Sequence, residues 1–373
     1  MKIGILSMQR VANFGSVLQS YSLKKIVESI TDCECCFIDI CKQPEDQGIE
    51  LPIIDYSIEN GKKSVLKKID RYIFYRVINR YKYKNQIKII NEFQNKTLLL
   101  DDASLSHTYD ICIIGSDEVF NCLQPSSWGY TSQLFGNVKN ALKVFTYAAS
   151  CGSTSVTQLT DSLKSNISES LSNITELSVR DKNTYDFVFS LTNRKAMINL
   201  DPVVVGDFTS EISANSVEQP EKYCIIYSYY NRFHNKKEIE AILEFCKSKK
   251  LKLVSVFAPQ YWIKHYAVLN PFQVLSFFEN AEFVITDTFH GTIFAAKYAK
   301  KYGVMIRESN KNKLEDLIQR LDISEHILKE IGELEKVFAI VDDKKKMKSI
   351  ESEEYIRTKQ YLENAILDNR MEV

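Results

Sequence analysis

Short apolar runs rich in Ile, Val, Phe and Tyr alternate along the chain with longer segments whose apolar residues recur at three- and four-residue steps. The short runs have the length of β-strands, and the longer segments have the periodicity of helices. This alternation is typical of parallel sheets with helical crossovers, so the sequence predicts an α/β fold. The predicted strands are 2–6, 36–40, 110–114, 143–147, 176–179, 196–200, 222–229, 251–257, 282–286 and 303–306.

The segment 207–220 separates six of these strands from the other four, and it is polar, Ser-rich and without periodicity. Such a composition is typical of a linker. A chain of 373 residues is also longer than one hydrophobic core normally organises. We therefore expect a first Rossmann-like domain at 1–212, a second at 213–330, and a helical tail at 331–373 that packs back on the first domain.

Two helical segments stand out from the rest of the pattern. The first, about 62–100, predicts an insertion in the first domain, whose apolar face is formed by Leu66, Ile69, Ile73, Val77 and Tyr81. Its other face is basic, with Lys62, Lys63, Lys67, Lys68, Arg71, Arg76, Arg80, Lys82, Lys84 and Lys88. This face is either solvated or adsorbs to an anionic membrane surface. The second segment, 353–367, predicts a charged helix with Ser352 placed to cap its start.

Composition and charge exclude several classes of protein. The 48 Lys and Arg residues balance 48 Asp and Glu residues, so there is no general basic field for nucleic acid. The sequence has no secretory leader and no apolar stretch of the ~18 residues that a membrane span requires. We therefore expect a cytoplasmic protein, at the inner face of the membrane if the basic helix adsorbs. The 9 Cys residues are irregularly spaced, and the pair Cys33 and Cys36 has no second pair, so we expect reduced thiols and neither metal nor cofactor.

Residues that directly follow the predicted strands are the candidates for chemistry, because ligands bind at the carboxyl ends of strands in open α/β sheets. After 2–6 come Asn13 and Gly15, which open a helix and leave backbone N–H groups for an anion or a sugar. A plain helix cap explains this stretch equally well. After 110–114 comes Asp117, whose carboxylate either binds sugar hydroxyls, removes a proton or caps a helix. Cys151 has no base paired with it in sequence, so we interpret it as a packing residue.

Two further strand ends carry more specific side chains. Arg180 follows 176–179 and would aim a planar cation at a carboxylate or phosphate, unless it forms a surface pair with Asp181. His290 follows 282–286 and opens a predicted helix. A histidine at such a position is well placed to give a proton to a substrate, and we prefer this role to a structural one.

Together these stretches resemble the polysaccharide pyruvyl transferase family, from Asn13 to about Ile323. The motifs that carry the resemblance are N-x-G-x-x-L-Q-x-Y at 13–21, G-S-D-x-x-F-N at 115–121, Y-A-A-S-x-G at 147–152, S-x-R-D at 178–181, L-D-P at 200–202, D-T-F-H-G at 287–291, and a helix with a basic start and spaced leucines, Lys313, Leu317 and Leu321. Each motif alone is weak, but seven in this order are specific.

The resemblance implies two Rossmann-like domains facing a cleft, similar to the GT-B glycosyltransferases. It also implies phosphoenolpyruvate as donor and a reaction that bridges two sugar hydroxyls with a pyruvate ketal. The product would be a capsule, exopolysaccharide or cell-wall glycan, built on a lipid-linked acceptor. Arg180 and His290 match the positions that the family uses at its donor site. Many members carry an arginine where this chain has Thr288, so Arg307 or Lys313 is expected to supply the missing charge.

These arguments assign roles to the candidate residues. His290 is the expected catalytic acid, and Asp117 is the base or an acceptor ligand. The expected donor-binding residues are Arg180, Thr288, Gly291, Arg307 and Lys313, and the expected acceptor-binding residues are Asn13, Gly15, Ser116 and Asn121. Two rival functions are a nucleotide-sugar glycosyltransferase, with Tyr229, Tyr230, Phe233 and Trp262 as base stackers, and a non-catalytic glycan-binding partner.

Overall fold

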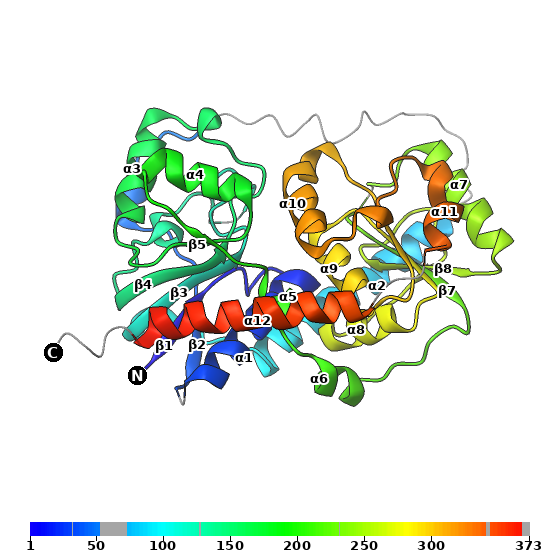
Figure 1. Ribbon diagram of the computed structural model, residues 1–373, viewed down its shortest axis with the longest axis horizontal. Helices are drawn as coiled ribbons and strands as arrows, with labels where there is room; N and C mark the ends of the chain where they lie inside the picture. Colours follow the sequence, from blue (N-terminus) through cyan, green and yellow to red (C-terminus); the bar gives the residue numbers. More distant parts are fainter. Residues whose placement is uncertain (32, 53–72, 127, 231, 341–343, 368–373) are drawn as a thin grey trace.

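Two parallel sheets covered by helices form two lobes in the computed structural model, which describes residues 1–31, 33–52, 73–126, 128–230, 232–340 and 344–367 (Figure 1). The first sheet has the strand order β2-β1-β3-β4-β5-β6. Its strands are β1 (Ile3–Leu6), β2 (Cys35–Ile38), β3 (Tyr109–Asp117), β4 (Ala141–Ala149), β5 (Ser178–Val179) and β6 (Met197–Ile198). Its neighbouring helices include α1 (Phe14–Ile30), α3 (Asp161–Leu171), α4 (Lys182–Thr192) and α5 (Pro202–Val205).

The second sheet has the strand order β11-β10-β7-β8-β9. Its strands are β7 (Tyr223–Ser228), β8 (Lys252–Phe257), β9 (His265–Tyr266), β10 (Phe283–Thr286) and β11 (Tyr302–Val304). The helices of this half are α7 (Lys236–Ser248), α8 (Pro271–Glu279), α9 (Phe289–Tyr298), α10 (Lys311–Leu321) and α11 (Leu334–Phe338). All ten predicted strands are present, whereas β9 is too short to give a periodic signal in the sequence.

Both sheets have parallel pairs throughout the described residues, which confirms the α/β class with two separate parallel sheets. The strands read as near-continuous apolar runs because helices bury both faces of such a sheet. In each sheet, the chain adds strands first on one side and then on the other. The resulting switch points lie between β1 and β3 and between β7 and β10. Open α/β sheets bind ligands at such points.

The predicted linker 207–220 is not free of structure, because it contains the helix α6 (Thr209–Ala214). Glu211 on this helix lies 2.6 Å from the Lys25 ammonium and accepts a hydrogen bond from the Tyr21 hydroxyl on α1. Ile212 packs against the core. The sequence did not predict α6, because the helix has no repeated apolar face. A few polar side chains make its contacts with α1 instead.

The helix α2 (Ile73–Lys96), which was expected as an insertion in the first domain, contacts both lobes: it packs on α1 of the first lobe and on β9 of the second sheet. Its predicted apolar face is wrong, since Val77 and Tyr81 are 68% and 69% exposed. The buried positions include Asn79 and Gln86, and the Asn79 amide donates to the carbonyl of Ile263 near β9 (3.0 Å). Amides are buried here because backbone groups at the sheet edge require hydrogen-bond partners. The part of the predicted helix before Ile73 lies outside the described residues.

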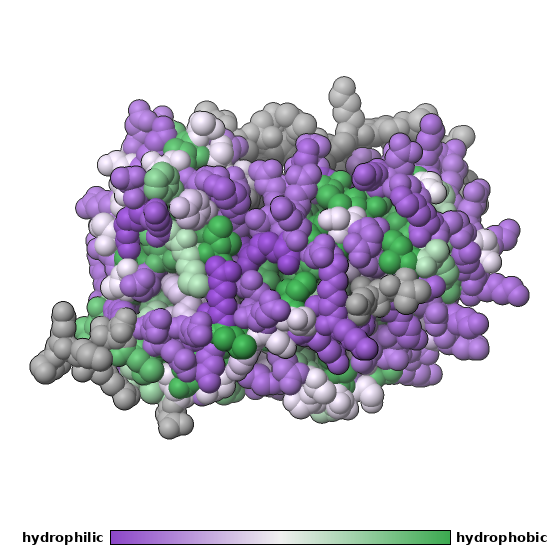
Figure 2. Space-filling view, in the orientation of Figure 1, coloured by the Kyte–Doolittle hydropathy of each residue, from purple (hydrophilic) through white to green (hydrophobic). Residues whose placement is uncertain are grey.

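The helix α12 (Lys344–Leu367) runs across both lobes and packs on α1, α5 and α9 (Figure 1). The Tyr361 hydroxyl donates to the carbonyl of Thr146 on β4, which ties the helix to the first sheet (2.7 Å). Ser352 lies inside this helix and donates to the carbonyl of Lys348, so its predicted role as a cap is wrong. The helix begins at Lys344 rather than at Ser352, and its first two turns are rich in lysine. The face that α12 crosses is mostly hydrophilic (Figure 2).

The segment just before α12 belongs to the second lobe rather than to a separate tail. Leu334 and Val337 on α11 are buried against the second sheet. In the part of the chain that the structure describes, none of the helices combines the length and apolarity that crossing a bilayer demands.

Candidate active site

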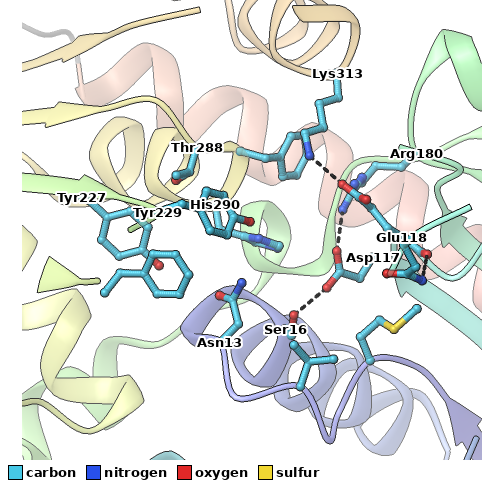
Figure 3. A pocket seen from close by; sticks show the side chains of 15 residues that line it. Asn13, Ser16, Asp117, Glu118, Arg180, Tyr227, Tyr229, Thr288, His290 and Lys313 are labelled. Carbon is cyan, nitrogen blue, oxygen red and sulfur yellow. Dashed lines mark hydrogen bonds and ion pairs between the residues drawn. The ribbon is translucent and has the colours of Figure 1, made fainter. Parts of the chain in front are cut away.

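An inner pocket of about 220 Å³ lies between the carboxyl ends of the two sheets (Figure 3). Loops and helix starts from both lobes supply its polar lining, which includes Asn13, Ser16, Asp117, Glu118, Arg180, Tyr227, Tyr229, Thr288, His290 and Lys313. Asn13 and Ser16 follow β1, Asp117 ends β3, and His290 follows β10. The pocket therefore joins both switch points, where the topology alone places a ligand.

His290 is the second residue of α9, and its side chain is 10% exposed. The Thr288 hydroxyl caps this helix by accepting a hydrogen bond from the N–H of Gly291 (3.0 Å). The imidazole lies against Gly15 of the other lobe, where a Cβ atom would be 2.1 Å from its Nδ1. Gly15 is therefore needed for the close approach of two lobes, a role that the sequence did not indicate.

Asp201, the N-cap of α5, joins the polar groups of the site and is fully buried. Its Oδ2 lies 3.2 Å from Nη1 of Arg180 and 3.4 Å from Nε2 of His290. The Ser116 hydroxyl donates to the same oxygen. Burial opposes ionisation of Asp201, but His290 and Arg180 outweigh it and hold the pKa at about 2. An ionised carboxylate thus holds the histidine of one lobe beside the arginine of the other.

Arg180 is 2% exposed and is surrounded by acidic groups. Its Nη1 lies 3.5 Å from Oδ1 of Asp117, and its guanidinium lies over the Phe289 ring, 4.1 Å from the centroid. Burial opposes its charge, but Asp201 and Asp117 raise the pKa of Arg180 above its usual value. The alternative interpretation, a surface pair with Asp181, is not among the ion pairs of the described residues: Arg180 is buried and the Asp181 carboxylate caps α4.

Asp117 faces the pocket and accepts a hydrogen bond from the Ser16 hydroxyl (2.8 Å). Its neighbour Ser116 is fully buried beneath the pocket, where its hydroxyl bonds to Asp201. Asn13 lines the pocket, but its side-chain oxygen caps α1 by accepting from the N–H of Gly15 (2.8 Å). Of the expected acceptor ligands near α1 and β3, Asn13 therefore reaches the pocket, and Ser116 does not.

Lys313 at the start of α10 lies in the pocket wall and forms an ion pair across the lobes with Glu118 (2.6 Å). Burial opposes ionisation of Glu118, but Lys313 and Arg180 lower its pKa to about 2. Arg307 does not line the pocket, because its guanidinium binds both carboxylate oxygens of Glu238 (2.8 and 3.1 Å). Of the two cations considered in place of an arginine at Thr288, Lys313 lines the pocket and Arg307 does not.

Three buried polar atoms in the pocket wall make no hydrogen bond within the described residues. They are the hydroxyl of Tyr227, Nε of Arg180 and Nε2 of His290, the last of which has its ion contact with Asp201 but no hydrogen bond. Native proteins satisfy most of their buried polar groups, so an exception of this kind needs an explanation. A gathering of such groups around one pocket is typical of a site that binds a polar ligand.

An outer groove of about 630 Å³ adjoins the inner pocket. Asn121 lies in this groove, where its amide donates to Glu118 and its oxygen accepts from the Thr154 hydroxyl (both 2.8 Å). Arg232, which follows β7, also lines the groove, and it donates to the carbonyl of Asp287 (3.3 Å).

Sequence reasoning missed three charged residues of the site. Asp201 stands in the L-D-P motif, so the motif was noticed but no role was given to its carboxylate. Glu118 directly follows Asp117, and its partner Lys313 is distant in sequence. Arg232 was not identified because it does not directly follow the predicted strand 222–229, but lies three residues beyond its end.

The fold and the site together define a two-lobed α/β protein with a polar pocket at its switch points that contains a buried histidine and a buried arginine. The polysaccharide pyruvyl transferase family matches residues 13–301, and the chain belongs to that family. This membership makes it a transferase and implies a polysaccharide acceptor.

Comparison with curated protein sequences gives no match. Among solved structures, the chain is similar to the UDP-GlcNAc 2-epimerase of Methanocaldococcus jannaschii, with 12% identity, a TM-score of 0.44, and 97% of this chain and 100% of that chain covered. The UDP-GlcNAc 2-epimerase of Neisseria meningitidis has 10% identity and a TM-score of 0.41, with 98% of this chain and 94% of that chain covered. The apo structure of OtsA has 10% identity and a TM-score of 0.48, with 100% of this chain and 99% of that chain covered.

Proposed function

We propose that the protein transfers the enolpyruvyl group of phosphoenolpyruvate onto two hydroxyls of one sugar, forming a pyruvate ketal in a capsule, exopolysaccharide or cell-wall glycan. Family membership supports the reaction class. The observation that carries the proposal is the convergence of His290 and Arg180 on Asp201 in a small pocket with unpaired polar atoms.

The donor's phosphate and carboxylate bind to Arg180 and Lys313 in this proposal. Both cations are already paired with carboxylates, Asp117 and Asp201 for the first and Glu118 for the second. A trianionic donor therefore binds by replacing some of these partners, and Nε of Arg180 offers an additional buried donor. The amide of Gly291 is occupied by its helix cap, so Thr288 and Gly291 shape the pocket rather than bind the donor through that N–H.

Two proton transfers follow from the arrangement. His290 gives a proton to the methylene carbon of the donor, which leaves positive charge on the neighbouring carbon. One sugar hydroxyl attacks that carbon while Asp117 takes its proton. Phosphate then leaves toward Arg180 and Lys313, and the second hydroxyl closes the ketal. The two sugar hydroxyls release two protons in total. One balances the proton that His290 gave to the donor's methylene carbon, and the other leaves on the phosphate.

The exposed basic face of α2 supports a lipid-linked acceptor at an anionic membrane. Arg80, Lys84 and Lys88 are exposed there beside Tyr81. Such residues add about 1 kcal/mol each near an anionic surface, and salt screens this attraction. Sedimentation with anionic liposomes should therefore show binding at low salt and release at high salt. No binding at low ionic strength would leave this face as a solvated one.

Thermal unfolding with candidate donors tests the proposed donor. A ligand that binds the native state adds RT ln(1 + [L]/Kd) to its stability, so phosphoenolpyruvate should raise the melting temperature. UDP-hexoses should not raise it. The opposite result would favour the nucleotide-sugar glycosyltransferase.

A further inference from the structure

The outer groove has the size of a separate ligand site. Its volume of about 630 Å³ falls within the ~300 to 1,000 Å³ of typical small-molecule pockets, whereas the inner pocket is smaller. The two spaces meet along a shared wall, formed by Glu118, Gln124, Tyr229, Thr288, Phe289 and Lys313. A molecule lying in the groove is therefore next to the inner pocket, with only these side chains between the two spaces.

The lining of the groove is polar and mostly uncharged. Amide and hydroxyl side chains dominate it, namely Asn121, Gln124, Ser153, Thr154, Gln158, Ser309 and Asn310. The charges in its wall are Arg232 and the ion pair of Glu118 with Lys313. Such a set of neutral donors and acceptors suits the hydroxyls of a sugar, whereas a pyrophosphate chain calls for more positive charge.

Tyr229 lines both the groove and the inner pocket, whose wall it shares with His290 (Figure 3). It is 41% exposed, and its ring is fixed by an edge contact with Phe257 (centroids 5.0 Å apart) and by the Arg232 guanidinium (4.8 Å from the centroid). An aromatic ring held in this way presents a rigid apolar surface with a polar tip. Its neighbour Tyr230 is 59% exposed and lines neither space.

We infer that the outer groove binds the acceptor saccharide, with Tyr229 as the platform that turns two hydroxyls of the sugar toward His290 and Asp117. This inference rests on the proposed function, because it needs a donor in the inner pocket. It moves the expected acceptor site from the α1 start, where Gly15 is covered by His290, to the groove that contains Asn121.

A groove-filling variant tests the inference without touching the inner pocket. Ser153 is exposed, lines the groove and makes no side-chain hydrogen bond among the described residues, so Ser153→Trp should fill the groove and leave the fold intact. Thr157→Trp, on the same segment but outside the groove, is the matched control. Tyr229→Ala and its control Tyr230→Ala form a second pair that removes the platform.

The readout is saturation-transfer NMR with methyl β-D-galactopyranoside and methyl β-D-glucopyranoside, on protein saturated with phosphoenolpyruvate. We expect transfer to at least one glycoside in the wild type and in both controls, and at least fivefold less transfer in Ser153→Trp and Tyr229→Ala. Undiminished transfer in Ser153→Trp, or no transfer to either glycoside in the wild type, would overturn the inference.

Calorimetric titration of each variant with phosphoenolpyruvate separates this inference from the proposed function. Ser153→Trp should bind the donor as the wild type does. A wild type that binds glycosides but not phosphoenolpyruvate would refute the donor and leave the groove in place. Competition of UDP-hexoses with the glycosides at equal concentration would instead assign the groove to a nucleotide sugar and overturn the inference.

Discussion

The contact of Gly15 with His290 gives the sharpest test of how the two lobes build the site. A Cβ at position 15 would lie 2.1 Å from Nδ1 and 2.2 Å from Cγ of the imidazole, and real Cβ contacts shorter than 3.0 Å essentially do not occur. Gly15→Ala therefore forces the ring or α1 to move by about 1 Å. A displacement of this size at a catalytic group costs about 100-fold in rate, or about 2.7 kcal/mol in the barrier.

The assay for this variant is single-turnover release of phosphate from phosphoenolpyruvate in the presence of acceptor glycan. Gly332→Ala is the matched control, because a Cβ there meets nothing within 4 Å. The melting temperature of Gly15→Ala should also fall, because overpacking a buried contact costs about 1 to 3 kcal/mol, so turnover is measured well below the melting temperature of the variant. A Gly15→Ala enzyme with wild-type turnover would show that the position of His290 against α1 does not matter for the reaction.

The remaining predictions concern the charged groups of the pocket. His290→Asn should lose turnover and keep donor affinity, since the amide roughly keeps the shape but gives no proton to carbon; Arg180→Ala should instead weaken donor binding by about 1.5 to 3 kcal/mol in calorimetry. Glu118→Gln should strengthen donor binding by releasing Lys313, whereas Lys313→Ala should weaken it and Lys311→Ala, at the rim, should not. Asp201, whose pKa is lowered to about 2, stabilises the fold above pH ~4 and loses this contribution as the pH falls toward 2. Asp201→Asn should thus be less stable than the wild type by about 2 kcal/mol at neutral pH in urea unfolding, and the deficit should shrink below pH 4.

The strands were predictable from the sequence because parallel strands buried on both faces are short apolar runs between turns. The run Ile111–Ile114 is an example, and it occupies the centre of β3. The inward face of α2 was not predictable, since Asn79 and Gln86 are buried where they donate to the carbonyls of Ile263 and Leu269, in the loops on either side of β9 and far away in sequence. Local periodicity carries no information on such a partner.

The sequence was enough to predict which strand ends supply residues of the site. It was not enough to predict which of the charged side chains pair with each other there. The topological rule placed Asp117 and Arg180 at the carboxyl edge of the first sheet and His290 at that of the second, and the structure brings all three to the inner pocket. The sequence did not reveal that Asp201 joins two of them, because a buried carboxylate in a helix cap has the same local signature as an exposed one. The choice between Arg307 and Lys313 also depended on tertiary contacts, since Glu238 on α7 binds Arg307.

The most direct test of the proposed function follows the fate of phosphoenolpyruvate labelled with ¹³C at its second carbon. The protein is incubated with this donor and lipid-linked glycans, and the products are analysed by ¹³C NMR and mass spectrometry. We predict release of phosphate and an acceptor heavier by one pyruvate less one water, with the label in a quaternary ketal carbon. Unchanged donor together with hexose transfer from a nucleotide sugar to the same glycans would contradict the account.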